Sequence, residues 1–354
     1  MSSVAFTQQK GMKLRSIFSI ASIVFASLVI TSEAYGLSGE SIVLDPNTGD
    51  YRVTYFGADL SGKKNGKVQR QAVYVPATKI QPAVISSLKL DGTNVVYSYL
   101  LKNASSSQQS LASFAVAPVS DIISKTPLKN SGQGRDLEAI EKQDEVISEA
   151  LKTPQSWTGL VWSHNAGGLQ IMWRYYFANK GLKAGSSQDG FGFSSKDIPG
   201  IGIAQFRGRT PVLMFVDGGP TGKIKNQLKD LRRNNFISRA VAVPAIAVPK
   251  TFNAAVLLER IRSHVSTWSG MKLLDPAFAA QLDRHMAAAA RAFKRNQPQA
   301  GRDNIQSLRK LLEHEHGNLD RDAGNAGDKS ATSIDRLAAR VLDFDLQYVL
   351  ERMK

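Results

Sequence analysis

The sequence predicts an all-β domain followed by an all-α domain: an antiparallel β-sandwich with a helical insertion, and then a small C-terminal helical bundle. Between residues 42 and 119, and again between 158 and 216, apolar and polar residues alternate in short runs separated by turn residues. This pattern is typical of half-buried antiparallel strands. From residue 253 onward the apolar residues recur every three or four positions, which indicates amphipathic helices.

Residues 1–36 predict a secretory signal peptide. Lys13 and Arg15 precede an uncharged, largely apolar run at 16–30, and small residues follow at Ala34 and Gly36. A basic start, an apolar centre and small residues two apart define a cleavable leader. We expect translation to start at Met12 and the protein to be exported to the periplasm or the medium. An uncleaved anchor is the alternative, although the run is shorter than the roughly 20 residues that span a bilayer.

The β-domain is expected to cover residues 37–219. Predicted strands lie at 51–56, 68–75, 95–101, 111–116, 158–163, 168–177, 199–206 and 210–216. Asn65-Gly66 suits the tip of a hairpin. Residues 120–156 interrupt the alternation with a predicted helix at 136–151, so this part is interpreted as a helical insertion between strands.

Residues 220–252 are expected to join the two domains. A short basic helix is predicted at 223–234, and Pro244 and Pro249 bracket a run that suits neither a helix nor a central strand. We therefore predict an extended linker there, with the domains separating near Val248.

The bundle is expected to cover residues 253–354. Its first helix starts after Asn253, and the second has Asp275 as its cap and Pro276 at its first position. The third ends at His316 before Gly317, and a polar loop follows at 318–331. Thr332 and Asp335 resemble a capping box that opens the last helix.

Several kinds of site are excluded or left without support by the residues present. The chain has no cysteine, which rules out disulfides, thiolate metal sites and cysteine nucleophiles. His314 and His316 lack the i, i+4 spacing of a helical zinc pair, and the glycine-rich runs at 181–202 lack the context of a phosphate loop. His164 is interpreted as a turn residue. No catalytic residue, metal or cofactor is therefore predicted, although paired carboxylates that meet only in the folded protein stay open.

The aromatic residues of the β-domain have two interpretations. Exposed planar rings on a sandwich can bind sugars, whereas strand alternation places most of these rings in the core. The residues concerned are Tyr97, Tyr99, Trp157, Trp162, Trp173, Tyr175 and Tyr176.

Positive charge is concentrated in one part of the chain. The formal net charge is +15, and residues 157–250 hold 13 basic and 4 acidic residues. The candidate ligand-binding residues form an anionic-ligand surface: Lys223, Lys225, Lys229, Arg232 and Arg233. Such a surface would bind an anionic polysaccharide, cell-surface polymer or lipid, and no nucleic acid is expected. A solvated helix face is the alternative interpretation, and a protein partner stays open.

Parts of the chain resemble a group of exported bacterial proteins of unknown function with an Ig-like β-sandwich. The resemblance lies in Tyr97-Ser98-Tyr99, Asn103, Gln108, Trp157 and the runs 190–195 and 198–201. The helical tail is similar to small bundles appended to many secreted bacterial proteins, through Leu257-Leu258, Leu282, Ala287, Ala300, Leu308, Leu337-Ala338 and Tyr348. The resemblance implies architecture and no catalytic residue. We therefore expect an exported, non-catalytic binding or interaction protein, with a secreted hydrolase of extracellular polysaccharide or another polymer as the alternative.

Overall fold

The computed structural model describes residues 39–58, 67–123, 150–163, 168–175, 181–210, 219–220, 222–316 and 333–353. Contacts divide the chain into Met1–Ser38 and Gly39–Lys354, and the fold below is that of the second unit. The predicted leader, the hairpin tip at Asn65-Gly66, most of the 120–156 insertion and the loop 318–331 lie outside the described residues. The predicted strand at 210–216 does so as well, except for its first residue.

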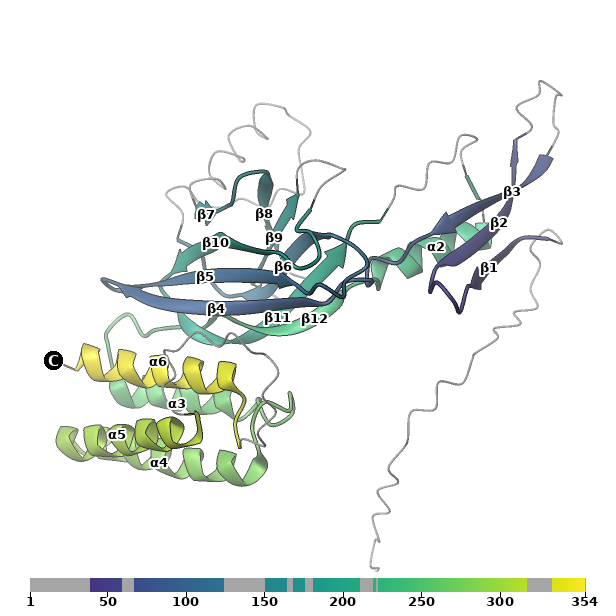
Figure 1. Ribbon diagram of the computed structural model, residues 1–354. Coiled ribbons are helices and arrows are strands. Elements are labelled where there is room, and N and C mark those ends of the chain that lie inside the picture. Colours follow the sequence, from purple (N-terminus) through teal and green to yellow (C-terminus); the bar gives the residue numbers. More distant parts are fainter. Residues whose placement is uncertain are drawn as a thin grey trace, which may run out of the picture. The chain divides into compact units, whose positions relative to one another are not determined.

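Two antiparallel sheets form the predicted sandwich (Figure 1). The four-stranded sheet has the order β4-β5-β10-β7, with bounds Pro82–Asp91, Asn94–Asn103, Ser187–Ser195 and Leu151–Lys152. The five-stranded sheet has the order β12-β11-β6-β9-β8, with bounds Ile237–Ile246, Ile198–Gly208, Leu111–Val119, Leu169–Tyr175 and Trp157–Ser163.

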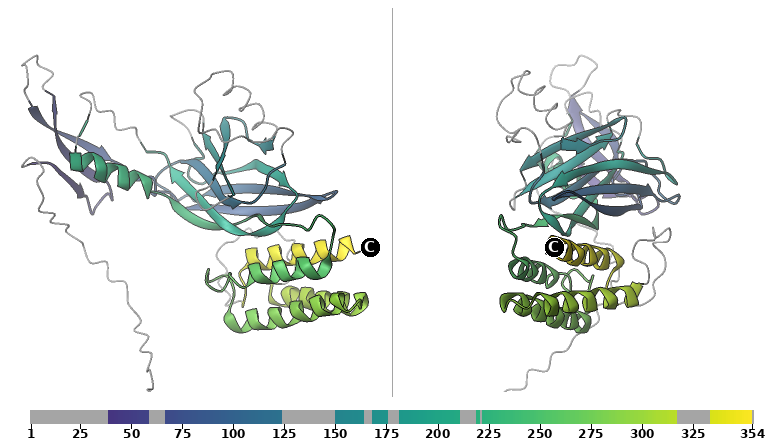
Figure 2. Two further views of the ribbon diagram at one scale, coloured as in Figure 1. Left: turned by 180° about the vertical axis from the view of Figure 1, so that it is seen from behind. Right: turned by 90° about the vertical axis from the view of Figure 1, so that its left-hand side faces the viewer.

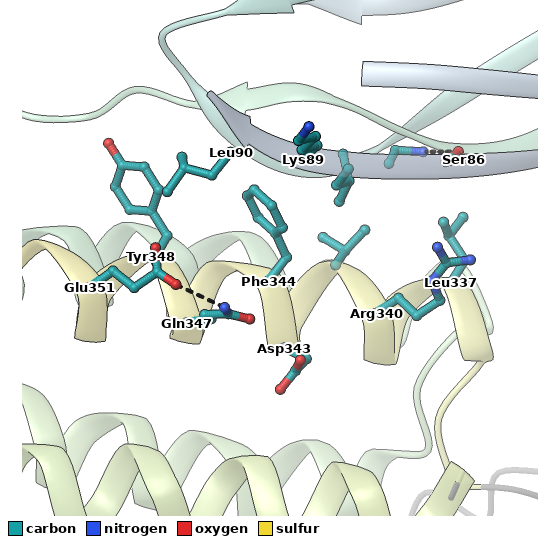
Figure 3. A pocket seen from close by; sticks show the side chains of 13 residues that line it. Ser86, Lys89, Leu90, Leu337, Arg340, Asp343, Phe344, Gln347, Tyr348 and Glu351 are labelled. Carbon is teal, nitrogen blue, oxygen red and sulfur yellow. Dashed lines mark hydrogen bonds between the residues drawn. The ribbon is translucent and has the colours of Figure 1, made fainter. Parts of the chain in front are cut away.

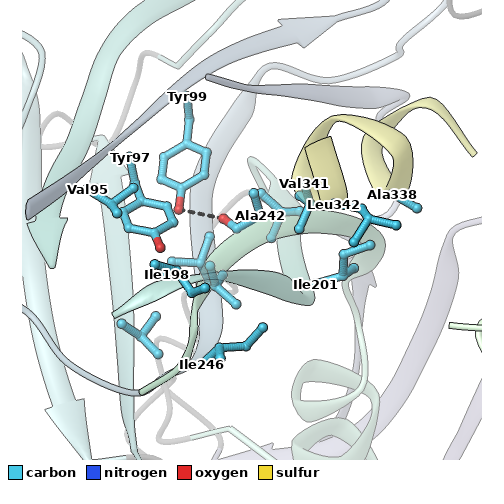
Figure 4. Packing of buried hydrophobic residues seen from close by; sticks show 14 of the residues in the cluster. Val95, Tyr97, Tyr99, Ile198, Ile201, Ala242, Ile246, Ala338, Val341 and Leu342 are labelled. Atoms are coloured by element: carbon cyan, nitrogen blue, oxygen red, sulfur yellow. Dashed lines mark hydrogen bonds between the residues drawn. The ribbon is translucent and has the colours of Figure 1, made fainter. Parts of the chain in front are cut away.

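Aromatic rings fill the space between these two sheets. The ring of Phe114 stacks on Trp173 with centroids 5.2 Å apart and meets Tyr99 edge-on at 5.5 Å. The Tyr99 hydroxyl donates to the Ala242 carbonyl at 2.9 Å, which satisfies its polar end inside the core (Figure 4). Tyr97, Tyr99, Trp157 and Trp173 are all buried. Their core interpretation is confirmed, and a sugar-binding surface made of these four rings is wrong.

The first three strands form a separate sheet, which corrects their predicted place in the sandwich. β1 (Ser41–Leu44), β2 (Tyr51–Ala58) and β3 (Lys67–Tyr74) pair only with one another. Their apolar side chains pack against α2 (Gly222–Arg233), the predicted basic helix. Alternation shows that a strand has one buried face, but it does not show which element covers that face.

The predicted linker at 243–249 is largely strand β12, and this prediction is wrong. β12 continues to Ile246, with Pro244 opposite Pro199 on β11. Because β12 lies at the edge of its sheet, the ladder tolerates a residue without an N–H. The two prolines therefore indicate an edge strand and its end rather than a linker between independent domains.

Four helices form the bundle: α3 (Ala254–Val265), α4 (Pro276–Lys294), α5 (Pro298–His316) and α6 (Arg336–Arg352). The predicted cap of α4 is confirmed, since Asp275 accepts from the Ala277 N–H. The start of α3 after Asn253 is confirmed as well, and Asn253 is the cap, accepting from the Val256 N–H. The predicted capping box is wrong because Asp335 is itself the cap of α6, accepting from the Leu337 N–H at 2.8 Å. None of the described helices is long and apolar enough to span a bilayer.

The sandwich and the bundle share one hydrophobic core. α3 and α6 form the layer next to the strands, and α4 and α5 lie beyond it (Figure 2). Ala338, Val341 and Leu342 of α6 belong to the same buried cluster as Ile201 and Ala242 of the sheet (Figure 4). Residues 39–354 accordingly form one compact unit, and the predicted boundary near Val248 does not separate two units.

Candidate functional site

The basic face of α2 is held on a rigid support. Ile224 and Leu228 are buried against the three-stranded sheet β1–β3, called the small sheet below. The opposite side of the helix therefore faces solvent. At about 100° per residue, Lys225, Lys229, Arg232 and Arg233 occupy one continuous exposed sector. We call these four residues the basic face. Lys223, the fifth predicted residue, is exposed on the other flank, near Asp230.

The basic face has little neutralising charge around it. Among the described residues, no acidic side chain forms an ion pair with Lys225, Lys229, Arg232 or Arg233. Arg207 of β11 adds another exposed cation, and its Nη2 donates to the Arg233 carbonyl at 3.3 Å. The face therefore continues from the helix onto the neighbouring sheet.

Tyr74 lies under the C-terminal end of this face. Its hydroxyl accepts from Asn235 Nδ2 at 2.8 Å. Burial raises the pKa of Tyr74, while the bond to Asn235 and the charges of Arg232 and Arg207 act in the opposite direction. The Asn235–Tyr74 hydrogen bond therefore links the segment that follows α2 to the end of strand β3.

A hollow of about 270 Å³ lies between β4 and α6 (Figure 3). Its apolar lining comes from Leu88, Leu90, Leu337, Val341 and Phe344, and its polar lining includes Lys89, Arg340, Gln347 and Glu351. The sequence did not predict this site, because its two walls lie some 250 residues apart along the chain and neither contains a recognisable motif.

The carboxylates beside the hollow do not form a catalytic pair. Both Asp343 and Glu351 line the hollow. Asp343 Oδ1 accepts from Arg309 Nε at 2.6 Å, and Glu351 accepts from Gln347 Nε2 at 2.9 Å (Figure 3). Two acids that serve a hydrolase must flank one substrate bond. The described residues also contain no cluster of three or more histidine or acidic groups suited to a metal. The alternative of a secreted hydrolase therefore gains no support from this site.

One buried and one half-buried titratable group lie where the bundle meets the sandwich. Asp345 of α6 is fully buried, neither of its carboxylate oxygens has a hydrogen-bond partner, and burial raises its pKa well above the usual value. His264 Nε2 accepts from the Ile201 N–H at 3.0 Å, and burial lowers the pKa of that ring. Neither group lines the hollow, so we assign both to the interface between sandwich and bundle.

Comparison with known proteins identifies no family for this chain. No family model matches the chain, and no curated protein matches it. One solved structure that matches is an uncharacterised protein from Nocardia farcinica described as having an immunoglobulin-like fold. It is 12% identical, and the match covers 46% of this chain and 98% of that chain with a TM-score of 0.23. A likeness this weak carries no argument about function, so the sandwich assignment rests on the strand pairing itself.

Proposed function

We propose that this chain is a non-catalytic interaction protein that binds an anionic polysaccharide through the basic face of α2. The observation that carries the proposal is the arrangement of Lys225, Lys229, Arg232 and Arg233, four exposed cations without acidic partners among the described residues. A helix face that only keeps a protein soluble usually mixes both signs of charge. A face that carries only positive charge, on a helix held in place by the sheet beneath it, is instead suited to binding a polyanion.

The physical basis of binding is the release of counterions. A polyanion carries condensed cations, and each protein cation that replaces one of them returns it to solution. Because α2 is already ordered against the small sheet through Ile224 and Leu228, binding orders only the ends of the four side chains. Low ordering cost favours association even when each contact is weak.

The predicted leader motivates the choice of a polysaccharide as the polyanion. Residues 1–36 lie outside the described residues, and export stays a prediction from their sequence. A protein outside the cytoplasm meets charged cell-surface polysaccharide rather than nucleic acid. Export can therefore be tested separately, by determining the N-terminal residue of the mature protein.

Retention on immobilised heparin, measured against salt, tests the proposal. We expect Lys225→Gln, Lys229→Gln and Arg233→Gln together to bring elution to clearly lower salt and to reduce the slope of log affinity against log salt by about two. The matched control replaces three dispersed exposed lysines, Lys183, Lys196 and Lys310, by Gln. It removes the same charge from elsewhere and should elute close to wild type.

Equal elution of the two triple variants would overturn the proposal, because net charge alone would then explain retention. Anionic vesicles form a second arm of the experiment. Binding to vesicles but not to heparin, with the same dependence on the basic face, would replace the polysaccharide by a lipid surface.

A further inference from the structure

The outer edge of β4 is only half covered. β4 is the edge strand of its sheet and pairs with β5 alone. At its first half, the Pro82 carbonyl accepts from Arg239 Nε at 3.1 Å, and Ser86 Oγ accepts from the Ala242 N–H of β12 at 3.1 Å. β12 therefore covers residues 82–86 and leaves the rest of the strand.

The uncovered half presents backbone groups in a fixed order. Asp91 pairs with Asn94 across the two-residue turn Gly92-Thr93. Residues that flank such a turn hydrogen-bond to each other, so alternate residues further along the strand direct their N–H and C=O outward. Leu88 and Leu90 are among these alternate residues. Pro82 is another, and its carbonyl accepts a hydrogen bond from Arg239 outside the sheet. Among the described residues, no strand or side chain bonds the outer groups of Leu88 and Leu90.

The hollow lies directly beside this uncovered edge. Leu88 and Leu90 line the hollow from β4, and Figure 3 shows the ring of Phe344 on α6 directed toward β4 beside Leu90. With a volume of about 270 Å³, the hollow falls below the roughly 300–1,000 Å³ of pockets that enclose a drug-sized molecule. It has room for one or two apolar side chains. The part of the hollow lined by Leu88, Leu90 and Phe344 is apolar, whereas Arg340, Gln347 and Glu351 make the rest of its lining polar. An apolar wall beside a row of outward-facing backbone donors and acceptors suits an extended peptide.

Lys89 determines which peptide fits. Lys89 borders the hollow, but alternation along the strand directs the end of its side chain to the face opposite Leu88 and Leu90, and Figure 3 shows its nitrogen on the side of β4 away from α6. Lys89 is exposed and has no ion pair among the described residues. A residue paired beside Lys89 would lie on the same face as that ammonium group, where an acidic side chain is favoured. Its two neighbours would then point to the side of the hollow, where apolar side chains are favoured.

We propose that the 88–90 edge of β4 binds an extended peptide with an apolar–acidic–apolar core, which adds to the sheet as a further strand. The two apolar side chains enter the hollow against Phe344, and the acidic one pairs with Lys89. This site is distinct from the basic face of α2, and its test does not depend on polysaccharide binding.

A fluorescent, end-capped peptide with the core Val-Glu-Val between threonines is the probe. We expect saturable binding, together with slower amide exchange at Leu88 and Leu90, because their N–H groups would become paired. The same peptide N-methylated at the backbone nitrogens that face β4 should not bind. A peptide with Lys at the centre should bind more weakly than the Glu peptide by about tenfold.

Two protein variants complete the test. Lys89→Glu should reverse the preference, so that the Lys-centred peptide becomes the tighter ligand, whereas Lys183→Glu at a distant exposed position should leave the order unchanged. Affinity weaker than about 1 mM for every peptide would overturn the proposal. Binding that is insensitive to N-methylation, or an unchanged preference in Lys89→Glu, would overturn it as well.

Discussion

Asp345 is a carboxyl group on the buried face of a helix. It interrupts the apolar pattern of that helix, but the sequence does not show what surrounds it. The sequence predicts the last helix from Leu337, Val341, Phe344 and Tyr348, and α6 confirms it. Asp345 lies among these residues, but its sequence position does not show that it is fully buried with neither oxygen hydrogen-bonded. Burial of a carboxyl group without hydrogen-bond partners is the kind of defect that costs stability.

Asp345→Asn should raise the free energy of unfolding at neutral pH by about 1–3 kcal/mol. The folded-state pKa of Asp345 is raised by burial above the ordinary value of 3.8. The folded protein therefore holds this proton more tightly than the unfolded chain, and the resulting stabilisation is present at low pH and lost as pH rises through the raised pKa.

Denaturant unfolding at a series of pH values checks this expectation. The difference between wild type and Asp345→Asn should grow as pH rises, whereas Asp303→Asn, at an exposed position on α5, should follow wild type. Parallel curves for wild type and Asp345→Asn would show that the carboxyl does not titrate differently in the folded state.

Among the elements, helix ends were easier to predict than strand partners. Asp275 followed by Pro276 defines a helix start through local chemistry alone, and α4 begins there. β12 depends instead on β11, whose paired residues all lie more than 30 positions away in sequence, and its Pro244 argued against a central strand. Local capping can be predicted from neighbouring residues, whereas sheet edges require knowledge of which strand lies next.

The contact between α3 and β11 should be sensitive to a single methyl group. A Cβ at Gly200 would collide with His264 Nε2 and lie 2.7 Å from the Ala245 Cβ. Gly200→Ala is therefore expected to destabilise the protein by about 1–3 kcal/mol through overpacking. Gly270→Ala is the matched control, since its nearest neighbour would be the Thr267 carbonyl oxygen at 3.4 Å. Thermal unfolding of both variants measures the effect, and equal melting temperatures would contradict it.

For the whole molecule, the shared core predicts one cooperative unit. Because Val341 and Leu342 of α6 pack in the same cluster as Ile201 of the sandwich, removing either part exposes apolar surface on the other. Truncated chains that end at Val248 or begin at Asn253 should lose most of their protection against proteolysis and amide exchange. In the full chain, strand β11 and helix α4 should lose protection at the same denaturant concentration. A stable, well-protected fragment of 253–354 would contradict this expectation.

The two candidate sites differ in how far the sequence revealed them. Four residues of the basic face share one side of α2 because their spacing is local, and that spacing can be read directly from residues 225–233. The hollow beside β4 requires that Leu88 and Phe344 meet, which depends on how the bundle packs against the sandwich. No local sequence pattern encodes such a contact between residues that are far apart in the chain.

The small sheet and the helix that covers it come from two distant parts of the chain, since β1–β3 end at Tyr74 and α2 begins at Gly222. Closing a loop of that length early in folding would carry a large entropic cost and yield only the Val53–Tyr55 cluster on α2. Once the sandwich has formed, it holds the two ends near each other, as the Asn235–Tyr74 bond shows. We therefore expect the small sheet to pack against α2 only after the sandwich has formed. Docking through α2 would become available only in a molecule whose sandwich is already complete.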